Sequence, residues 1–138
     1  MARLTLTAGE SVGLSSGNYT IYGTATGTET VTVSVGTVVT LDASFNRGGD
    51  VITLTGTAAS YSAVRSGSSI ILTDASGGSV TIPVGTTATT VKFSDVAAGR
   101  TLVYDTTAGS ITLGSQAVST ATVTVAAGTG GTTADAAR

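Results

Sequence analysis

The stretch TVTVSV at residues 30–35 decides the fold class of this chain. Its three valines alternate with three hydroxyl side chains. Because successive residues of a β-strand point to opposite faces, one face of the stretch is apolar and the other is polar. Residues 120–125 repeat this alternation of Thr with Val, whereas residues 38–41 and 51–54 are more continuously apolar, as expected for strands covered on both faces. These segments therefore predict β-strands.

Signals of the same kind continue along the chain. Residues 4–6 and 19–22 predict short strands, and from Tyr61 onward the pattern predicts a meander of hairpins, the first closing at Ser66-Gly67. Pro83 cannot donate a ladder hydrogen bond, so we expect it at a sheet edge or a strand end. The chain is thus predicted to be all-β, an antiparallel β-sandwich or jelly-roll of about twelve short strands with extended terminal strands. No fixed repeat of about 20–50 residues is visible, which makes a solenoid the less favoured alternative.

The length of 138 residues predicts a single domain, which we assign to residues 1–125. Residues 126–138 are rich in Gly, Thr and Ala and are predicted to form a flexible tail. Within the domain, residues 1–14 and 119–125 are candidate intersubunit strands, because the free N–H and C=O groups of a terminal strand can pair with a sheet edge of another molecule. The open alternative is that both terminal strands pair within their own domain.

The composition argues against an enzyme. The chain has no His and no Cys, the usual sources of a group that titrates near neutral pH or of a strong nucleophile. The carboxylates Glu29, Asp74, Asp95 and Asp105 lie near predicted strand ends in ordinary turn contexts, without aromatic platforms, so we do not expect a glycosidase pair. Lys92 is expected to be a solubilising charge on the solvent face. We therefore predict no enzymatic activity and no catalytic residues.

The charge and hydropathy of the chain argue against a nucleic-acid partner and against a membrane span. The six basic residues are scattered and the net charge is −2, so the clustered Lys and Arg that bind phosphate are missing and no nucleic-acid partner is expected. No apolar run has the length of a membrane span, and none near residue 1 has the length of a secretory signal. An acidic, Lys-poor, Thr-rich composition without Cys is common in bacterial secreted and surface proteins. We expect an extracellular or cell-surface location.

Residues 42–50, with the sequence DASFNRGGD, form an oxygen-rich loop between two apolar strands. Calcium takes several oxygen ligands from carboxylates, amides, carbonyls and water. Asp42, Asn46 and Asp50 are therefore the candidate metal ligands, with Ca²⁺ as the expected cofactor. The alternative is an Asx-rich turn in which Asp50 pairs with Arg47, since turns favour Asp, Asn and Gly for backbone reasons alone.

A family resemblance is carried by several stretches of the chain. They are YGTATGTETVT at 22–32, Leu41-Asp42, VITLTG at 51–56, IPVG at 82–85, FSD at 93–95 and TLV at 101–103. Over roughly residues 19–118 the chain resembles a β module of bacterial type I-secreted, haemolysin-type calcium-binding-associated surface proteins. The resemblance implies export, an extracellular address and calcium, and it supplies no enzymatic activity. Gly48-Gly49-Asp50 matches only a fragment of the calcium-binding pattern G-G-x-G-x-D, so a β-roll of tandem repeats is not expected.

Taken together, the sequence predicts a self-assembling extracellular structural protein, a filament or surface-layer subunit whose copies polymerise by β-strand addition. Head-to-tail contacts that do not close into a ring generate filaments. The alternative is an extracellular recognition module that binds a glycan or another surface protein. Tyr19, Tyr22 and Tyr104 are the aromatic candidates for such binding, although Tyr104 shares a strand face with Leu102 and is expected in the core.

Overall fold

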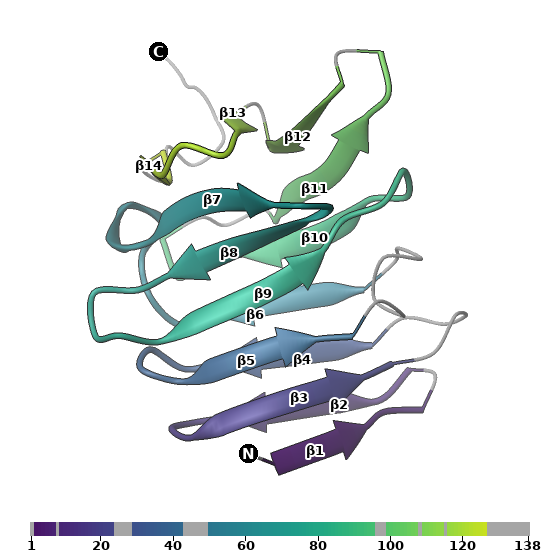
Figure 1. Ribbon diagram of the computed structural model, residues 1–138. Coiled ribbons are helices and arrows are strands. Elements are labelled where there is room, and N and C mark those ends of the chain that lie inside the picture. The colour runs from purple at the N-terminus through teal and green to yellow at the C-terminus, as the bar shows by residue number, and fades with distance from the viewer. Residues whose placement is uncertain are drawn as a thin grey trace.

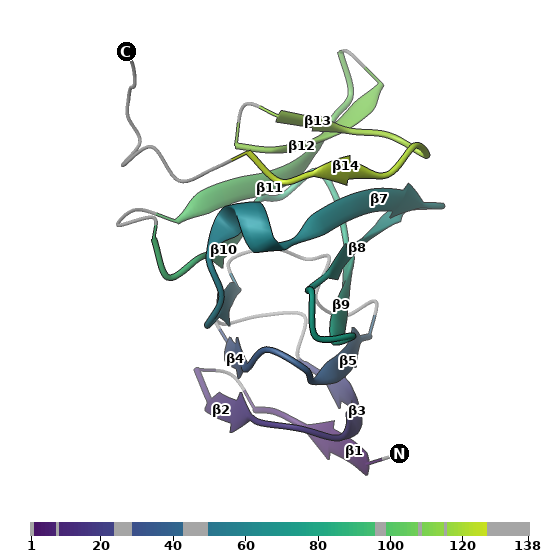
Figure 2. The ribbon, with the colours of Figure 1, turned by 90° about the vertical axis from the view of Figure 1, so that its left-hand side faces the viewer.

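The computed structural model describes residues 2–7, 9–23, 29–42, 50–95, 99–107, 109–114 and 116–126. These residues form two stacked β-sheets of seven strands each (Figures 1 and 2). The only helical element that they contain is a 3-10 turn, Ala58–Ser60. The prediction of an all-β sandwich is confirmed, with fourteen strands in the described residues where about twelve were expected.

Each sheet has a defined strand order. The first sheet consists, in spatial order, of β1 (Ala2–Thr5), β3 (Asn18–Tyr22), β5 (Val38–Leu41), β9 (Ser79–Pro83), β8 (Ser69–Thr73), β7 (Ser62–Ser66) and β14 (Val123–Thr124). The second sheet consists of β13 (Gln116–Val118), β12 (Ser110–Leu113), β11 (Arg100–Asp105), β10 (Thr89–Lys92), β6 (Val51–Leu54), β4 (Thr30–Val33) and β2 (Ser11–Leu14).

The first six strands wind as a solenoid. The chain alternates between the sheets, so that β1, β3 and β5 are parallel neighbours in one sheet while β2, β4 and β6 are parallel neighbours in the other (Figure 1). The fourth coil, β9 and β10, pairs in parallel with β5 and β6. The expected antiparallel pairing does not hold in this half, because each turn crosses to the opposite sheet instead of reversing within one sheet.

The solenoid repeat was not visible in the sequence because its length varies. Ala2 lies opposite Tyr19, Tyr19 lies opposite Val39, and Val39 lies opposite Val80. The intervals are therefore unequal, and the hairpin of β7 and β8 is inserted between the third and fourth coils. The solenoid that the sequence ranked as the less favoured alternative thus describes how the chain builds half of the sandwich.

The antiparallel prediction is confirmed in the rest of the chain. Strands β7, β8 and β9 form one meander, and β10, β11, β12 and β13 form another. Gly67, in the turn between β7 and β8, has a φ of 61°, the left-handed conformation for which the sequence predicted a glycine. Pro83 is the last residue of β9, at the strand end where its missing N–H is tolerated.

The core lies between the sheets and consists mainly of small aliphatic side chains. Alternate residues of the central strands point into it, among them Val31, Ile52 and Val91, which are fully buried. Burial of such a side chain contributes roughly 1.5–3 kcal/mol. Tyr61 and Phe93 are the aromatic exceptions, with ring centroids 5.5 Å apart, and the Tyr61 hydroxyl accepts a hydrogen bond from the Gly56 N–H at 3.2 Å.

The terminal segments pair within the chain in the residues described. β1 pairs with β3, β2 pairs with β4, and β14 pairs with β7. This is the alternative that the sequence left open for residues 1–14 and 119–125. What the fold offers to another molecule is therefore the outer edge of a strand that is already paired on its inner side.

Candidate functional site

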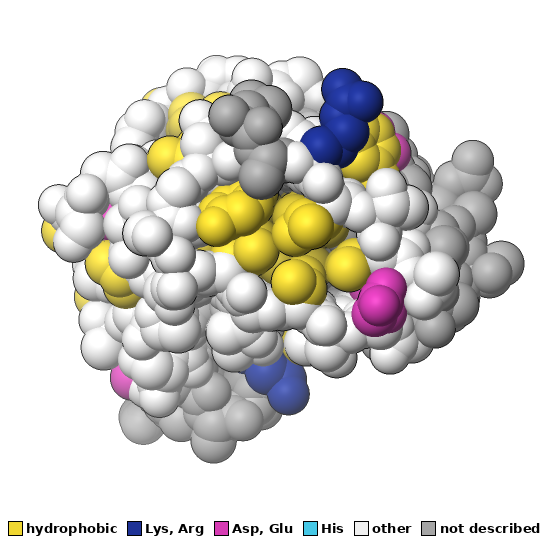
Figure 3. All heavy atoms as spheres, turned by 90° about the horizontal axis from the view of Figure 1, so that it is seen from below, with side chains coloured by type: hydrophobic (Ala, Val, Ile, Leu, Met, Phe, Trp, Pro, Cys, Tyr) yellow, Lys and Arg dark blue, Asp and Glu magenta, His cyan; other side chains and the backbone are white. Residues whose placement is uncertain are grey.

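The open end of the solenoid is the first candidate surface. β1 and β2 are the outermost strands of the two sheets and lie together at one end of the molecule (Figure 1). Seen from this end, a cluster of hydrophobic side chains fills the centre of the surface (Figure 3). Leu4 and Val12 of these strands are only partly buried, and Leu6 and Leu14, though counted in the core, retain 5% and 6% exposure. The first coil, β1 and β2, therefore leaves part of its apolar side chains, those of Leu4 and Val12, facing solvent.

The backbone of this end has a defined set of outward groups. The Leu6 N–H donates to the Tyr22 carbonyl at 2.8 Å, and the Glu10 carbonyl accepts from the Thr30 N–H at 3.0 Å. In a parallel sheet a residue directs both main-chain groups to one side and the next residue directs them to the other. Arg3, Thr5, Ser11 and Gly13 therefore direct their N–H and C=O groups away from the neighbouring strand, toward the open end.

The opposite end of the sandwich is closed differently. Its outermost strands, β13 and β14, have three and two residues. The Gln116 amide joins them, because its Nε2 donates to the Thr124 carbonyl and its Oε1 accepts from the Ala126 N–H, both at 2.9 Å. Val118 and Val125 close the core beneath, with 2% and 1% exposure. The two ends thus offer edges of unequal length.

Of the predicted calcium ligands, the structure describes Asp42 and Asp50, which adjoin strands of different sheets. Asp42 follows β5 in the first sheet, whereas Asp50 precedes β6 in the second. Asn46 and Arg47 lie outside the described residues. Asp42 is half-buried and donates its N–H to the Ile21 carbonyl at 2.8 Å. Asp50 is 1% exposed, and its nearest acidic neighbour in the sheet is a residue that the prediction left out, Glu29.

Glu29 and Asp50 form a buried carboxyl pair on adjacent coils. Glu29 is 0% exposed, and its N–H donates to Asp50 Oδ1 at 2.9 Å, while its carbonyl accepts from the Val51 N–H at the same distance. Asp50 Oδ2 is buried and has no hydrogen-bond partner. Burial raises the pKa of Asp50 from 3.8 to about 6. The hydrogen bond from the Glu29 N–H opposes this rise, and both the charge of Glu29 and its side-chain interaction with Asp50 add to it.

A pattern in the sequence places these carboxyls. Glu10, Glu29, Asp50 and Thr89 each precede two apolar residues at alternate positions, in the segments ESVGL, ETVTV, DVITL and TTVKF. The Thr30 N–H donates to the Glu10 carbonyl, the Val51 N–H to the Glu29 carbonyl and the Thr90 N–H to the Asp50 carbonyl. The four residues therefore lie side by side at the starts of β2, β4, β6 and β10, and we call them the polar column. A carboxylate at the parity of the buried residues was the signal that could have identified Glu29.

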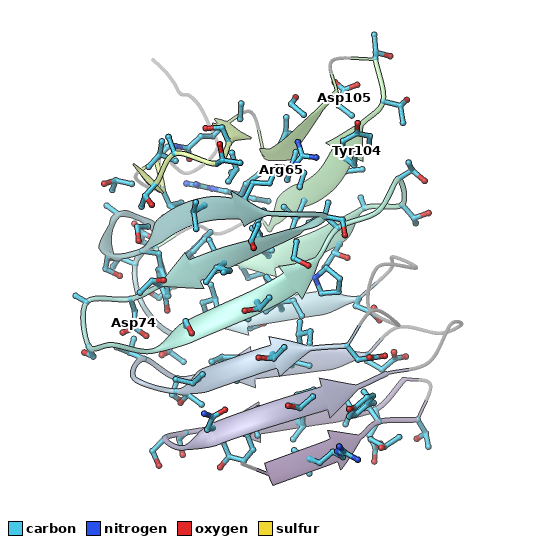
Figure 4. The ribbon with its side chains drawn as sticks, in the orientation of Figure 1. Arg65, Asp74, Tyr104 and Asp105 are labelled. Atoms are coloured by element: carbon cyan, nitrogen blue, oxygen red, sulfur yellow. The ribbon has the colours of Figure 1, made fainter. Side chains whose placement is uncertain are left out.

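Asp74 shows what a fully satisfied buried carboxylate looks like in this protein. It lies at the turn between β8 and β9 (Figure 4). Its Oδ1 accepts from the N–H groups of Ser76 at 2.7 Å and Gly78 at 3.0 Å, and its Oδ2 accepts from the Gly36 N–H at 2.9 Å. The side chain thereby ties two neighbouring turns together. Its role is structural, and it differs from Asp50 in having donors for both oxygens.

The remaining carboxylates serve turns. Asp95 Oδ1 accepts from the Ala58 N–H, and Asp105 Oδ1 accepts from the Thr107 N–H, both at 2.9 Å. Neither contact is with another carboxylate. A glycosidase would need two carboxyl groups that face each other across a cleft. Among the four carboxylates considered in the sequence, Glu29 has Asp50 as an acidic partner, and that pair is buried.

The aromatic candidates for glycan binding are partly covered. Tyr19 and Tyr104 pack against the core, as was expected for Tyr104. Arg65 of β7 and Tyr104 of β11 point toward one another, with the guanidinium carbon 5.7 Å from the ring centroid (Figure 4). The ring of Tyr22 lies 5.6 Å from the Arg3 guanidinium carbon. These rings join or shield parts of the sandwich, which weakens the case for an aromatic binding platform.

The fold and these sites define a two-layer β protein with a solenoid half. The chain matches no family model, and no curated protein or solved structure is significantly similar to it. Among the described residues, no helix is both long and apolar enough to cross a membrane.

Proposed function

We propose that this chain is a self-assembling structural protein of the cell surface or extracellular space, whose copies join through their sheet ends. The observation that carries the proposal is the open β1/β2 end, where two four-residue edges flank an apolar centre (Figure 3). An unpaired edge is a ready template for another strand. The extracellular location rests on composition and on the resemblance to secreted surface proteins.

A second copy is the partner that fits two edges at once. Stacked sheets are separated by about 10 Å, so a partner that pairs with both edges must present two strands at that spacing. The ends of another copy do so. When the β1/β2 end of one copy meets the β13/β14 end of the next, β2 pairs with β13, and β1 pairs with β14 once the Gln116 amide releases the Thr124 carbonyl and the Ala126 N–H. Because the contact is head-to-tail, it repeats without closing. The result is a filament, from which a surface layer can be built laterally.

The test removes outward N–H groups and leaves the internal ladder intact. Thr5→Pro and Gly13→Pro each delete an N–H that faces the open end, and proline is tolerated at such edge positions. Thr5→Ala and Gly13→Ala are matched controls that keep the N–H. A Cβ at Gly13 meets nothing within 4 Å.

We expect filaments or sheets of the wild-type protein in negative-stain electron microscopy and a broad high-mass distribution in analytical ultracentrifugation. The double Pro variant should sediment as a monomer with an unchanged far-UV spectrum, and the double Ala variant should assemble. A wild-type protein that stays monomeric at high concentration would refute the proposal. Assembly that is unaffected by both prolines would refute the role of this end.

A further inference from the structure

One carboxylate oxygen of Asp50, Oδ2, is buried without a hydrogen-bond donor. Asp50 is 1% exposed, and while Oδ1 accepts the Glu29 N–H, Oδ2 is buried without a hydrogen-bond donor. A buried polar atom without a partner carries a substantial desolvation cost, and the cost is larger for a charged group. Asp74, by comparison, has donors for both of its oxygens. An oxygen of this kind points to a ligand that supplies positive charge.

The surroundings of Asp50 Oδ2 are rich in oxygen. Glu29, directly before β4, and Thr89, the first residue of β10, are the neighbours of Asp50 on its two sides, and both are buried, with 0% and 2% exposure. The Glu29 N–H donates to Asp50 Oδ1 at 2.9 Å, which places the two residues side by side. The chain has no His and no Cys to compete as a ligand. Carboxylate and hydroxyl oxygens without nitrogen or sulfur suit a hard cation.

We propose that Glu29 and Asp50 bind a divalent cation of the size of calcium, which bridges strands β4 and β6 from the core side. Neighbouring strands are about 4.8 Å apart, and calcium–oxygen distances are about 2.3–2.6 Å, so one ion between the strands reaches an oxygen of each residue. Magnesium needs distances near 2.0–2.1 Å and gives up its water reluctantly, so it fits this buried pair less well.

The site differs from the one that the loop sequence predicted. It uses Asp50 with Glu29, 21 residues away in sequence, and it does not use Asp42.

The experiment measures thermal unfolding of the purified chain at pH 7.5 in chelator, in millimolar calcium chloride and in millimolar magnesium chloride. We expect calcium to raise Tm by about 10 °C when it is in hundredfold excess over its Kd, and magnesium to have a much smaller effect. Isothermal titration with calcium should give one site per chain. Neither readout depends on assembly, so the result is separable from the test of the proposed function.

Asp50→Asn and Glu29→Gln should abolish the calcium response, while Asp105→Asn, which alters a surface turn, should keep it. An identical wild-type Tm in calcium and chelator, together with no heat of binding, would overturn the proposal. So would a full calcium response in Asp50→Asn. A response lost in Asp42→Asn but kept in Glu29→Gln would assign the ion to the loop instead. If a variant fails to fold, the wild-type titration still decides whether a site exists.

Discussion

Ionisation of Asp50 should make this protein less stable as the pH rises from 4 to 7 in the absence of divalent cations. Burial raises the pKa of Asp50 from 3.8 to about 6. The folded protein therefore holds the Asp50 proton more tightly than the unfolded chain does. At a pH below 3.8, Asp50 is protonated in both the folded and the unfolded protein. Between the two values the folded state holds more protons, so the free energy of unfolding falls as the pH increases.

The magnitude follows from the size of the shift. A shift of one pKa unit corresponds to about 1.4 kcal/mol, so the full penalty for ionised Asp50 is about 3 kcal/mol once the pH is well above 6. Between pH 4 and pH 7 the penalty grows by about 2 kcal/mol. Asp50→Asn removes it, because an amide carries no charge, still accepts the Glu29 N–H through its oxygen, and can donate to a neighbouring carboxylate.

The assay compares urea unfolding of the wild type and Asp50→Asn at half-unit steps from pH 4 to pH 7, in chelator. Other carboxylates titrate in both proteins, so the difference between the two curves isolates Asp50. From pH 4 to pH 7, we expect the free energy of unfolding of Asp50→Asn to rise by about 2 kcal/mol relative to that of the wild type. Most of this change should occur between pH 4 and pH 6.5. Parallel stability curves would refute the reasoning, and so would a gain with the opposite sign.

The other predictions concern packing around Asp74 and the closed end. Gly78→Ala should lower the free energy of unfolding in urea by about 3 kcal/mol, because the added Cβ would overlap Asp74 Oδ2 and lie 2.7 Å from the N atoms of Gly36 and Thr37. Gly13→Ala is the control. The space around its Cβ is open, so it should change the free energy of unfolding by less than about 0.5–1 kcal/mol. Gln116→Ala should cost about 1 kcal/mol and speed amide exchange of Ala126, since it removes two hydrogen bonds that join β13 to the end of β14. Unchanged exchange at Ala126 would show that the Gln116 bridge does not hold this end.

The sequence predicts those parts of the fold that depend on local chemistry. Alternation at residues 30–35 identifies β4, and Gly67 identifies the β7–β8 turn because a residue with positive φ favours glycine. It does not predict which strands are neighbours in the first half. The parallel pairs join residues 17 to 41 positions apart, and the inserted hairpin breaks any regular interval. Pairing over such distances is set by the packing of the whole sheet.

The candidate metal site shows the same limit. Proximity in sequence grouped Asp42 with Asp50, but Asp42 follows a strand of the first sheet and Asp50 precedes a strand of the second. Glu29 reaches Asp50 only through the parallel register of β4 and β6. Side-chain parity alone could have shown that both residues face inward, because Glu29 shares its face with Val31 and Val33, and Asp50 shares its face with Ile52 and Leu54.

The buried part of the polar column, Glu29 and Asp50, also constrains the register of the strands. A slip of β4 by one residue would turn Val31 and Val33 outward and bury Thr30 and Thr32, so the apolar pattern already forbids it. A slip by two residues keeps every valine inside and is not excluded by that pattern. It would, however, separate the Glu29 N–H from Asp50 Oδ1 and leave a second buried carboxylate oxygen without a donor. The hydrogen bond between Glu29 and Asp50 therefore favours one of two strand registers that bury the same valines. In a chain with so many alternating Thr and Val residues, this contact helps to select a single register.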